Sequence, residues 1–232
     1  MSIYLSATAI KDYIACPKKI FYRTNFPELA ETTVNMEVGT IVHSVVEKYW
    51  ENEASARSYC GLECIKQNLS GEMTYKAELA IRNFFQNPVY GMLKRGDLVE
   101  HKFKIALDEN SYLVGKIDRI LGNGTVIDWK TSTTTPRTID KDPQFITYFY
   151  AYKSLFKKNP TSVLYVSLFD NKVVRLNVNF ATYQQLFHTI VPSMVTKIKR
   201  NDLPALGLFN GSCFGCLFKK SCLKDMEGEV GT

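Results

Sequence analysis

Apolar and polar residues alternate along three consecutive stretches in the middle of the chain, as they do in β-strands with one covered face. These stretches are residues 98–107, 112–121 and 125–131. Between the last two, Gly122-Asn123-Gly124 supplies residues that tolerate the positive φ of a tight hairpin turn. The pattern therefore predicts three consecutive antiparallel strands.

Further strands and several helices follow from the same kind of pattern. A near-continuous apolar run at 162–169 predicts a strand covered on both faces, and a shorter strand is expected at 172–178. Apolar residues at helical spacing predict helices at 7–21, 38–50, 58–68, 74–86, from 143 onward, and at 181–200. We expect a break in the first helix at Cys16-Pro17, because a residue before proline is biased away from the α region. The mixture predicts the α/β (α+β) class.

The central hairpin also carries the most suggestive chemistry. Side chains alternate along a strand, so Asp128 and Lys130 share one face while Trp129 lies on the other. Asp118 lies near the end of the preceding strand, so two carboxylates and an ammonium group are expected at one edge of the sheet. Because a partly buried charge needs a partner or a metal, we interpret the group as a divalent-metal site with a catalytic lysine. The alternative is a surface hairpin with ordinary charges.

Composition limits the class of protein only loosely. The chain has 232 residues, 45% of them hydrophobic, so a normal core is expected. Its net charge of +6 is compatible with a polyanionic partner but does not require one. We expect no membrane span and a cytoplasmic location, because the chain has no long apolar run and residues 1–6 lack the features of a secretory signal.

The six cysteines fall into two groups, candidate metal ligands and small buried residues. Three lie within ten residues near the C-terminus, which in a reducing compartment indicates a metal site more than disulfides. A fourth ligand is needed, and Cys16 is the best candidate; tetrahedral zinc and an iron–sulphur cluster both stay open, as does a set of unligated thiols. Cys60 and Cys64 are interpreted as small buried residues. The positions are 16, 60, 64, 213, 216 and 222.

Three further residues have both a packing and a functional interpretation. Gln144 and Tyr148 are four residues apart, so they share a helix face, either as core packing or in contact with a DNA strand. His43 follows Gly39 on an amphipathic helix, where a lone histidine is usually a packed or exposed residue with no chemistry. The polar segment 133–140 is expected to cross the mouth of the site as a loop.

Together these residues resemble the RecB-like branch of the PD-(D/E)xK nuclease superfamily, and most closely the iron–sulphur exonucleases associated with CRISPR adaptation. The matching elements occur in the family's order: Cys16-Pro17, His43 after Val38-Gly39, Gly115-Lys116-Ile117-Asp118, Asp128-Trp129-Lys130, Gln144 with Tyr148, and the last three cysteines. One departure is Asp128, where many relatives have glutamate; the shorter acid is also common in the superfamily.

The resemblance implies a fold and a division of the chain. The fold is a restriction-endonuclease-like core, with a central mixed β-sheet flanked by helices and the N- and C-terminal segments joined by a four-cysteine metal cluster. The chain is then one nuclease domain, residues 1–232. Its parts are a helical region at 1–95, a catalytic sheet core at 96–180, and a C-terminal helix with the cysteine cluster at 181–232.

The resemblance also implies roles for the site residues. Mn²⁺ or Mg²⁺ is bound by His43, Asp118, Asp128 and the backbone carbonyl of Trp129. Asp118, Asp128 and Lys130 are catalytic, with Lys130 orienting or deprotonating the attacking water. Gln144 and Tyr148 position the DNA. A [4Fe–4S] cluster, or alternatively Zn²⁺, is bound by Cys16, Cys213, Cys216 and Cys222.

The implied function is a metal-dependent DNA exonuclease. It acts on single-stranded ends, 5′ to 3′, with endonuclease activity in some relatives, in CRISPR-based antiviral defence. Expected partners are DNA and a CRISPR integrase or a helicase. One alternative is a DNA-end binding and trimming partner inside a CRISPR integration complex. Another is a zinc-stapled DNA-binding protein with a vestigial site, against which the full set Asp118, Asp128 and Lys130 argues.

Overall fold

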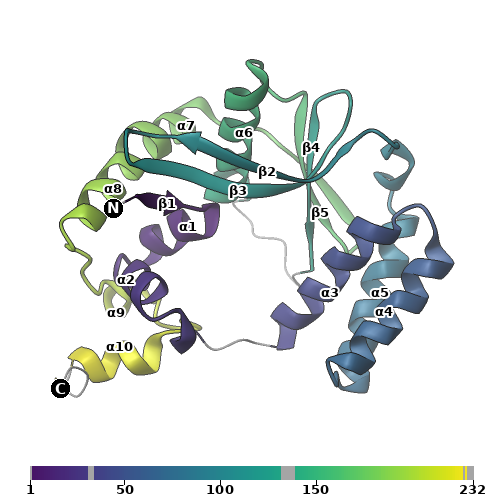
Figure 1. Ribbon diagram of the computed structural model, residues 1–232, viewed down its shortest axis with the longest axis horizontal. Coiled ribbons are helices and arrows are strands. Elements are labelled where there is room, and N and C mark those ends of the chain that lie inside the picture. Colours follow the sequence, from purple (N-terminus) through teal and green to yellow (C-terminus); the bar gives the residue numbers. More distant parts are fainter. Residues whose placement is uncertain (1, 31–33, 132–138, 227, 229–232) are drawn as a thin grey trace. The chain divides into compact units, whose positions relative to one another are not determined.

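The computed structural model describes residues 2–30, 34–131, 139–226 and 228 (Figure 1). The chain divides into two compact units that interleave along the sequence. Unit 1 consists of Met1–Thr32, Ala106–Val114 and Phe180–Thr232, and unit 2 consists of Thr33–Ile105 and Gly115–Asn179. The expected single domain over residues 1–232 stays a prediction.

The strands form one mixed sheet, as predicted. In the order β1-β3-β4-β5-β6, neighbours are hydrogen-bonded, and β2 also pairs with β3. β4 runs parallel to β5, whereas the β3–β4 and β5–β6 pairs are antiparallel. The strands are β1 (Ile3–Leu5), β2 (Leu98–Ala106), β3 (Ser111–Ile120), β4 (Thr125–Lys130), β5 (Ser162–Ser167) and β6 (Lys172–Leu176).

Helices account for most of the rest of the described chain. The α-helices are α1 (Ala7–Ala15), α2 (Lys18–Asn25), α3 (Val34–Tyr49), α4 (Glu53–Lys66), α5 (Gly71–Gln86), α6 (Pro143–Phe156), α7 (Phe180–Gln185), α8 (Val191–Lys199), α9 (Gly207–Asn210) and α10 (Lys219–Met226). Short turns of other helix types are η1 (Pro27–Leu29), η2 (Tyr90–Met92), η3 (Ile139–Lys141) and η4 (Leu186–Ile190).

Local sequence signals set several of these boundaries. The Ser6 hydroxyl accepts a hydrogen bond from the backbone N–H of Ala9 at 3.1 Å, and so caps α1. Asp142 caps α6 in the same way and Pro143 occupies its first turn. The predicted break at Cys16-Pro17 separates α1 from α2. The turn between β3 and β4 has Gly124 at a φ of 86°, as the hairpin prediction requires.

Three features differ from the sequence expectation. The helix expected at 181–200 contains a π-helical turn, η4, between α7 and α8. Pro192, in the first turn of α8, has no backbone N–H to donate, which explains why the regular hydrogen-bond ladder is interrupted there. Strand β1 was not predicted because its three residues are too short for a recognisable alternation. Helix α4 begins at Glu53, earlier than the expected residue 58, because Asn52 caps it.

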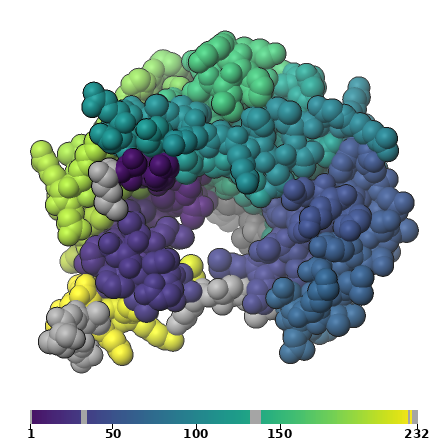
Figure 2. All heavy atoms as spheres, viewed as in Figure 1, coloured from purple at the N-terminus to yellow at the C-terminus, as the bar shows by residue number. Residues whose placement is uncertain are grey.

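The core of unit 2 lies between a helical layer and one face of the sheet. Helices α3, α4 and α5 pack side by side (Figure 1), and Figure 2 shows the atoms of this part of the chain as one continuous blue region. Their apolar residues form one buried cluster with Ile127, Trp129 and Leu164 of the central strands. The cluster includes Cys60 and Cys64, which are buried small residues as predicted. On the opposite face, Phe145 of α6 packs edge-on against Tyr165 of β5, with ring centroids 5.9 Å apart. Helix α6 is therefore the crossover between the parallel strands β4 and β5.

Within the described ranges, no helix combines the length and the apolar character that crossing a bilayer requires.

A buried ion pair fixes the base of the β3–β4 hairpin in unit 2. Arg119 and Asp97 are both 2% exposed at their side chains, and Arg119 Nε lies 3.1 Å from Asp97 Oδ2. The guanidinium lies 4.2 Å from the centre of the Trp50 ring and also donates to the Lys94 carbonyl oxygen at 3.0 Å. Asp97 in turn accepts a hydrogen bond from the Gly122 N–H at 3.2 Å. The pair therefore ties the hairpin turn to the segment before β2.

We predict that Arg119→Met lowers the free energy of unfolding by about 3 kcal/mol, because it leaves the buried Asp97 carboxylate without its partner. Urea unfolding followed by tryptophan fluorescence measures this, since Trp50 and Trp129 both belong to unit 2. Arg95→Met is the matched control, because Arg95 is 88% exposed in its pair with Glu51, and it should change stability far less. Equal effects of the two substitutions would contradict the importance of the buried pair.

Candidate metal and nucleic-acid site

A groove in unit 2 gathers the charged side chains that the sequence singled out. Helix α3 and strands β2, β3 and β4 contribute to it, and its volume is about 690 Å³. Its lining residues are Asn35, Met36, Gly39, Thr40, His43, Ser44, Glu47, Glu100, Lys116, Lys130 and Thr131. Asp118 and Asp128 lie beside it as buried side chains.

Asp118 lies between the histidine helix and strand β4. Its Oδ2 lies 3.7 Å from Nδ1 of His43 and accepts a hydrogen bond from the backbone N–H of Trp129 at 2.8 Å. His43 is itself hydrogen-bonded to the Trp129 backbone. Helix α3 can approach this closely because residue 39 is glycine: a Cβ there would lie 3.0 Å from Oγ1 of Thr131. His43, Asp118 and the Trp129 backbone are therefore brought together, and their role as metal ligands stays a prediction of the resemblance.

Asp128 and Lys130 lie on the same face of β4, which alternation along the strand predicts. Lys130 Nζ lies 3.0 Å from Oδ1 and 2.8 Å from Oδ2 of Asp128, so the ammonium group contacts both carboxylate oxygens. The Asp128 side chain is 1% exposed and that of Lys130 is 27% exposed. Lys130 thus connects a fully buried acid to the open groove.

Gln144 and Tyr148 reach the site from α6 but contact Asp128. Gln144 Nε2 donates to Asp128 Oδ1 at 3.1 Å and to the Tyr148 hydroxyl at 2.8 Å. Tyr148 is only 5% exposed. These contacts orient the carboxylate of Asp128. A DNA contact by Gln144 or Tyr148 stays a prediction.

Glu100 of β2 is a further acid beside His43 and Asp118. Its side chain is 12% exposed and forms an ion pair with Lys116 of β3. Its φ is 49°, in the left-handed region that non-glycine residues rarely adopt. The regular alternation of β2 is therefore interrupted at Glu100. From the sequence, Glu100 could either approach the site or be an ordinary polar residue of an edge strand, and the residue pattern did not decide between the two.

Burial dominates the electrostatics of these groups. It raises the pKa of Asp118 to about 6 and the pKa of Asp128 to about 6, against the attraction of Lys130. Burial also lowers the pKa of His43, which favours the neutral imidazole that binds metals. For Lys130, burial favours the neutral amine, but the charges of Asp128 and Asp118 outweigh it and raise the pKa. Lys130 is therefore a cation at neutral pH.

The donor set fits a divalent cation. Among the described residues, His43, Glu100 and Asp118 bring three ligand atoms within 4.8 Å of one another. Two carboxylates and one imidazole suit Mn²⁺ or Mg²⁺, with the nitrogen favouring Mn²⁺. Asp128 is not part of this three-atom group. The loop expected over 133–140 lies mostly outside the described residues, because 132–138 are not described.

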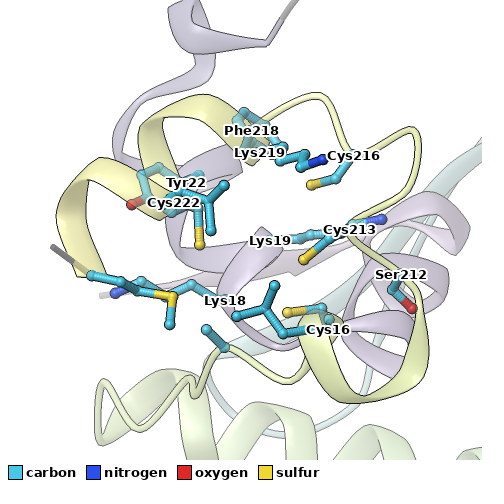
Figure 3. A pocket seen from close by; sticks show the side chains of 15 residues that line it. Cys16, Lys18, Lys19, Tyr22, Ser212, Cys213, Cys216, Phe218, Lys219 and Cys222 are labelled. Atoms are coloured by element: carbon cyan, nitrogen blue, oxygen red, sulfur yellow. The ribbon is translucent and has the colours of Figure 1, made fainter.

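A second pocket, in unit 1, is lined by the four cysteines of the sequence prediction. Cys16 lies between α1 and α2, Cys213 and Cys216 lie between α9 and α10, and Cys222 lies on α10. Figure 3 shows their side chains around the same space. The Leu206 N–H donates to Cys16 Sγ at 3.3 Å. The first and last segments of the chain therefore meet at this pocket.

Contacts around the pocket join α2 to α10. The Tyr22 hydroxyl donates to Asp225 Oδ2 at 3.1 Å, and Lys18 Nζ lies 3.3 Å from the same oxygen. The rings of Tyr22 and Phe218 stack with centroids 5.8 Å apart. Among the described residues, no three of the cysteine sulphurs lie within 4.8 Å of one another. The metal cluster expected at these cysteines stays a prediction.

Comparison with known proteins identifies the family. The family model described as the PD-(D/E)XK nuclease superfamily matches residues 4–223. The crystal structure of a candidate exonuclease from Eubacterium rectale is similar with a TM-score of 0.56 at 13% identity, covering 87% of this chain and 83% of that one. The crystal structure of SSO0001 gives a TM-score of 0.44 at 14% identity, covering 96% of this chain and 86% of that one. No curated protein sequence matches the chain.

The raised carboxylate pKa values predict a stability that depends on pH in the absence of metal. Because the folded-state pKa of Asp118 is about 6 and its ordinary value is 3.8, the folded state loses stability as the pH rises from about 4 to 6. Asp118→Asn should therefore raise the free energy of unfolding at pH 7.5 in EDTA by about 1–3 kcal/mol. The asparagine oxygen can still accept the Trp129 N–H.

Urea unfolding at pH 7.5 and at pH 4 measures this effect. The gain should largely disappear at pH 4, where Asp118 is already protonated in the folded state. Asp140→Asn, which changes an exposed carboxylate on η3, should show no such gain. A gain from Asp118→Asn that is equal at both pH values would contradict the assignment of the raised pKa.

Proposed function

Because the chain belongs to the PD-(D/E)XK nuclease superfamily, we propose that it is a divalent-metal-dependent nuclease whose centre is the groove of unit 2. One observation carries the proposal. Two buried carboxylates and a cationic lysine, from adjacent strands, lie beside a histidine that is also placed to bind metal. These are the groups that metal-assisted phosphodiester hydrolysis requires.

The cation would be held by Asp118, Asp128, His43 and the Trp129 carbonyl oxygen. When bound, it would act as a Lewis acid that stabilises negative charge on the phosphate. It would also lower the pKa of water, so that a hydroxide nucleophile is available at neutral pH. The hydrogen bond from the Trp129 N–H fixes Oδ2 of Asp118, and Gln144 fixes Oδ1 of Asp128. Both acids are thus oriented before a cation arrives, so little reorganisation accompanies its binding.

Lys130 acts as a fixed positive charge in this mechanism. Its raised pKa favours the ammonium form, which stabilises negative charge that develops on the phosphate oxygens and orients the attacking water. Since its side chain is 27% exposed, the ammonium group is accessible from the groove. Because Lys130 in its ion pair is already protonated, it does not take the proton of the attacking water.

DNA is the proposed substrate, and single-stranded ends are the proposed site of attack. The net charge of +6 and the two lysines of the groove favour a polyanion. Exonuclease action, in the 5′ to 3′ direction, rests on the RecB-like resemblance; the candidate exonuclease from Eubacterium rectale is compatible with it. A CRISPR integrase or a helicase as partner stays a prediction of that resemblance.

We expect Lys130→Ala to reduce cleavage of end-labelled single-stranded DNA in Mn²⁺ by about 100-fold or more, because a preorganised charge is removed from the transition state. Time-resolved product ladders on gels measure the rate. Lys158→Ala, which removes an exposed lysine beyond the end of α6, is the matched control and should cleave at the wild-type rate. If wild type and Lys130→Ala cleave equally, this centre is not the nuclease site.

We also propose that the cysteine pocket holds a structural [4Fe–4S] cluster. Four thiols from both ends of the chain line it, and an N–H group donates to one of them. Four thiolates suit tetrahedral zinc as well as an iron–sulphur cluster, and the choice of [4Fe–4S] rests on the RecB-like resemblance. The cluster would connect α2 to α10 and has no part in hydrolysis.

Protein prepared without oxygen should contain about four irons per chain and show the broad visible absorption of a thiolate-bound cluster. Cys222→Ser should lose iron and colour, because it removes one of four ligands. Cys60→Ala is the control, since Cys60 lies in the core of unit 2 and should keep both. A colourless wild-type protein that contains zinc would replace the iron–sulphur proposal with a zinc site.

A further inference from the structure

We propose that Glu100 is a direct ligand of the divalent cation, and that Lys116 is the counter-ion it releases when the cation binds. The inference rests on the proposed function, because it concerns the cation of the same site. It adds a third acid, from β2, to the ligands that the sequence motifs supply. It also gives Lys116 a defined role in two states of the site.

The ligand atoms lie close to the separation that one cation requires. Those of His43, Glu100 and Asp118 all lie within 4.8 Å of one another, and His43 Nδ1 lies 3.7 Å from Asp118 Oδ2. A cation with ligand bonds of about 2.0–2.2 Å separates its ligands by about 3–4.5 Å. Small side-chain movements are therefore sufficient to close the group on a cation.

The backbone at Glu100 supports a role beyond its ion pair. A glutamate at φ 49° is held in an unfavourable conformation, which persists only where the surrounding structure imposes it. The pair with Lys116 does not account for that cost, since Lys116 is 48% exposed and pairs with such exposure contribute little to stability. The conformation instead keeps the carboxylate, 12% exposed, beside His43 and Asp118.

Charge balance explains why Lys116 pairs with Glu100 in the absence of metal. Three carboxylates, Glu100, Asp118 and Asp128, meet two lysines, Lys116 and Lys130, while burial favours neutral His43. A divalent cation replaces the positive charge that Lys116 provides to Glu100. The Lys116 ammonium, which lines the groove, is then available to a phosphate of the nucleic acid.

Binding of Mn²⁺ without DNA, followed by electron paramagnetic resonance and titration calorimetry at pH 7.5, tests the proposal. Glu100→Gln should weaken Mn²⁺ binding by about 10- to 100-fold, as expected for loss of a ligand group. Lys116→Gln should tighten it by roughly two- to fivefold, because a competing ion pair of modest strength is removed. Opposite effects of the two partners are the signature of the proposed exchange.

Glu47→Gln is the matched control. Glu47 lines the same groove from α3 and is exposed, so the substitution makes the same change in charge outside the three-atom group. It should leave Mn²⁺ affinity within about twofold of wild type, because screening by water weakens charges at such sites. If Glu47→Gln and Glu100→Gln weaken binding equally, Glu100 acts only through general electrostatics and the proposal is wrong.

Two further outcomes separate this inference from the proposed function. If Glu100→Gln binds Mn²⁺ as wild type does while Asp118→Asn does not, Glu100 is no ligand and the nuclease centre stands. If Asp118→Asn also binds normally, the cation site itself is misplaced. Should Glu100→Gln fail to fold, the Lys116→Gln protein tests the proposal by itself. If Lys116→Gln binds Mn²⁺ as wild type does, or more weakly, the proposed exchange of Lys116 for the cation is wrong.

Discussion

The site of unit 2 depends on one constraint. Two carboxylates, those of Asp118 and Asp128, are buried next to each other. Asp118 and Asp128 are 7% and 1% exposed, and the pKa of each is raised to about 6 because burial penalises its charge. Lys130 offsets part of that penalty from the groove side, and the Trp129 N–H and Gln144 offset part through hydrogen bonds. A divalent cation fits this environment because it neutralises the buried negative charge that Lys130 and the hydrogen bonds offset only in part.

The strand that carries this charge is held firmly by its other face. Trp129 and Ile127 alternate with Asp128 and Lys130, and they enter the core formed by α3, α4 and α5. Phe84 packs edge-on against Trp129 with ring centroids 5.1 Å apart. Alternation along β4 therefore separates an apolar side that fixes the backbone from a polar side that performs chemistry. Groups of the polar side keep their positions because the apolar side is closely packed.

The parts of the site that depend on short-range sequence were predictable. Asp118, Asp128 and Lys130 belong to one hairpin, so period-two alternation and a glycine turn were enough to bring them together. The caps at Ser6 and Asp142 act over two or three residues and were equally readable. The family model covers these elements, since it matches residues 4–223.

The parts that depend on tertiary structure were not predictable in the same way. Glutamate gives no signal for a positive φ, so the direction of Glu100 follows only from the folded strand. Gln144 and Tyr148 were expected on one face, but whether that face meets Asp128 depends on how α6 crosses between β4 and β5. Strand β1 pairs with residues more than 100 positions later, which no local pattern records.

The cysteine pocket also has a consequence for the order of events during protein synthesis. Cys16 leaves the ribosome more than 200 residues before Cys222, while all segments of unit 2 are complete by Asn179. The pocket that Cys16 lines therefore cannot be complete before Cys222 has been synthesised. The pocket of unit 1 therefore joins segments that are made at the two extremes of this stretch, whereas every segment of unit 2 can fold before Cys222 exists.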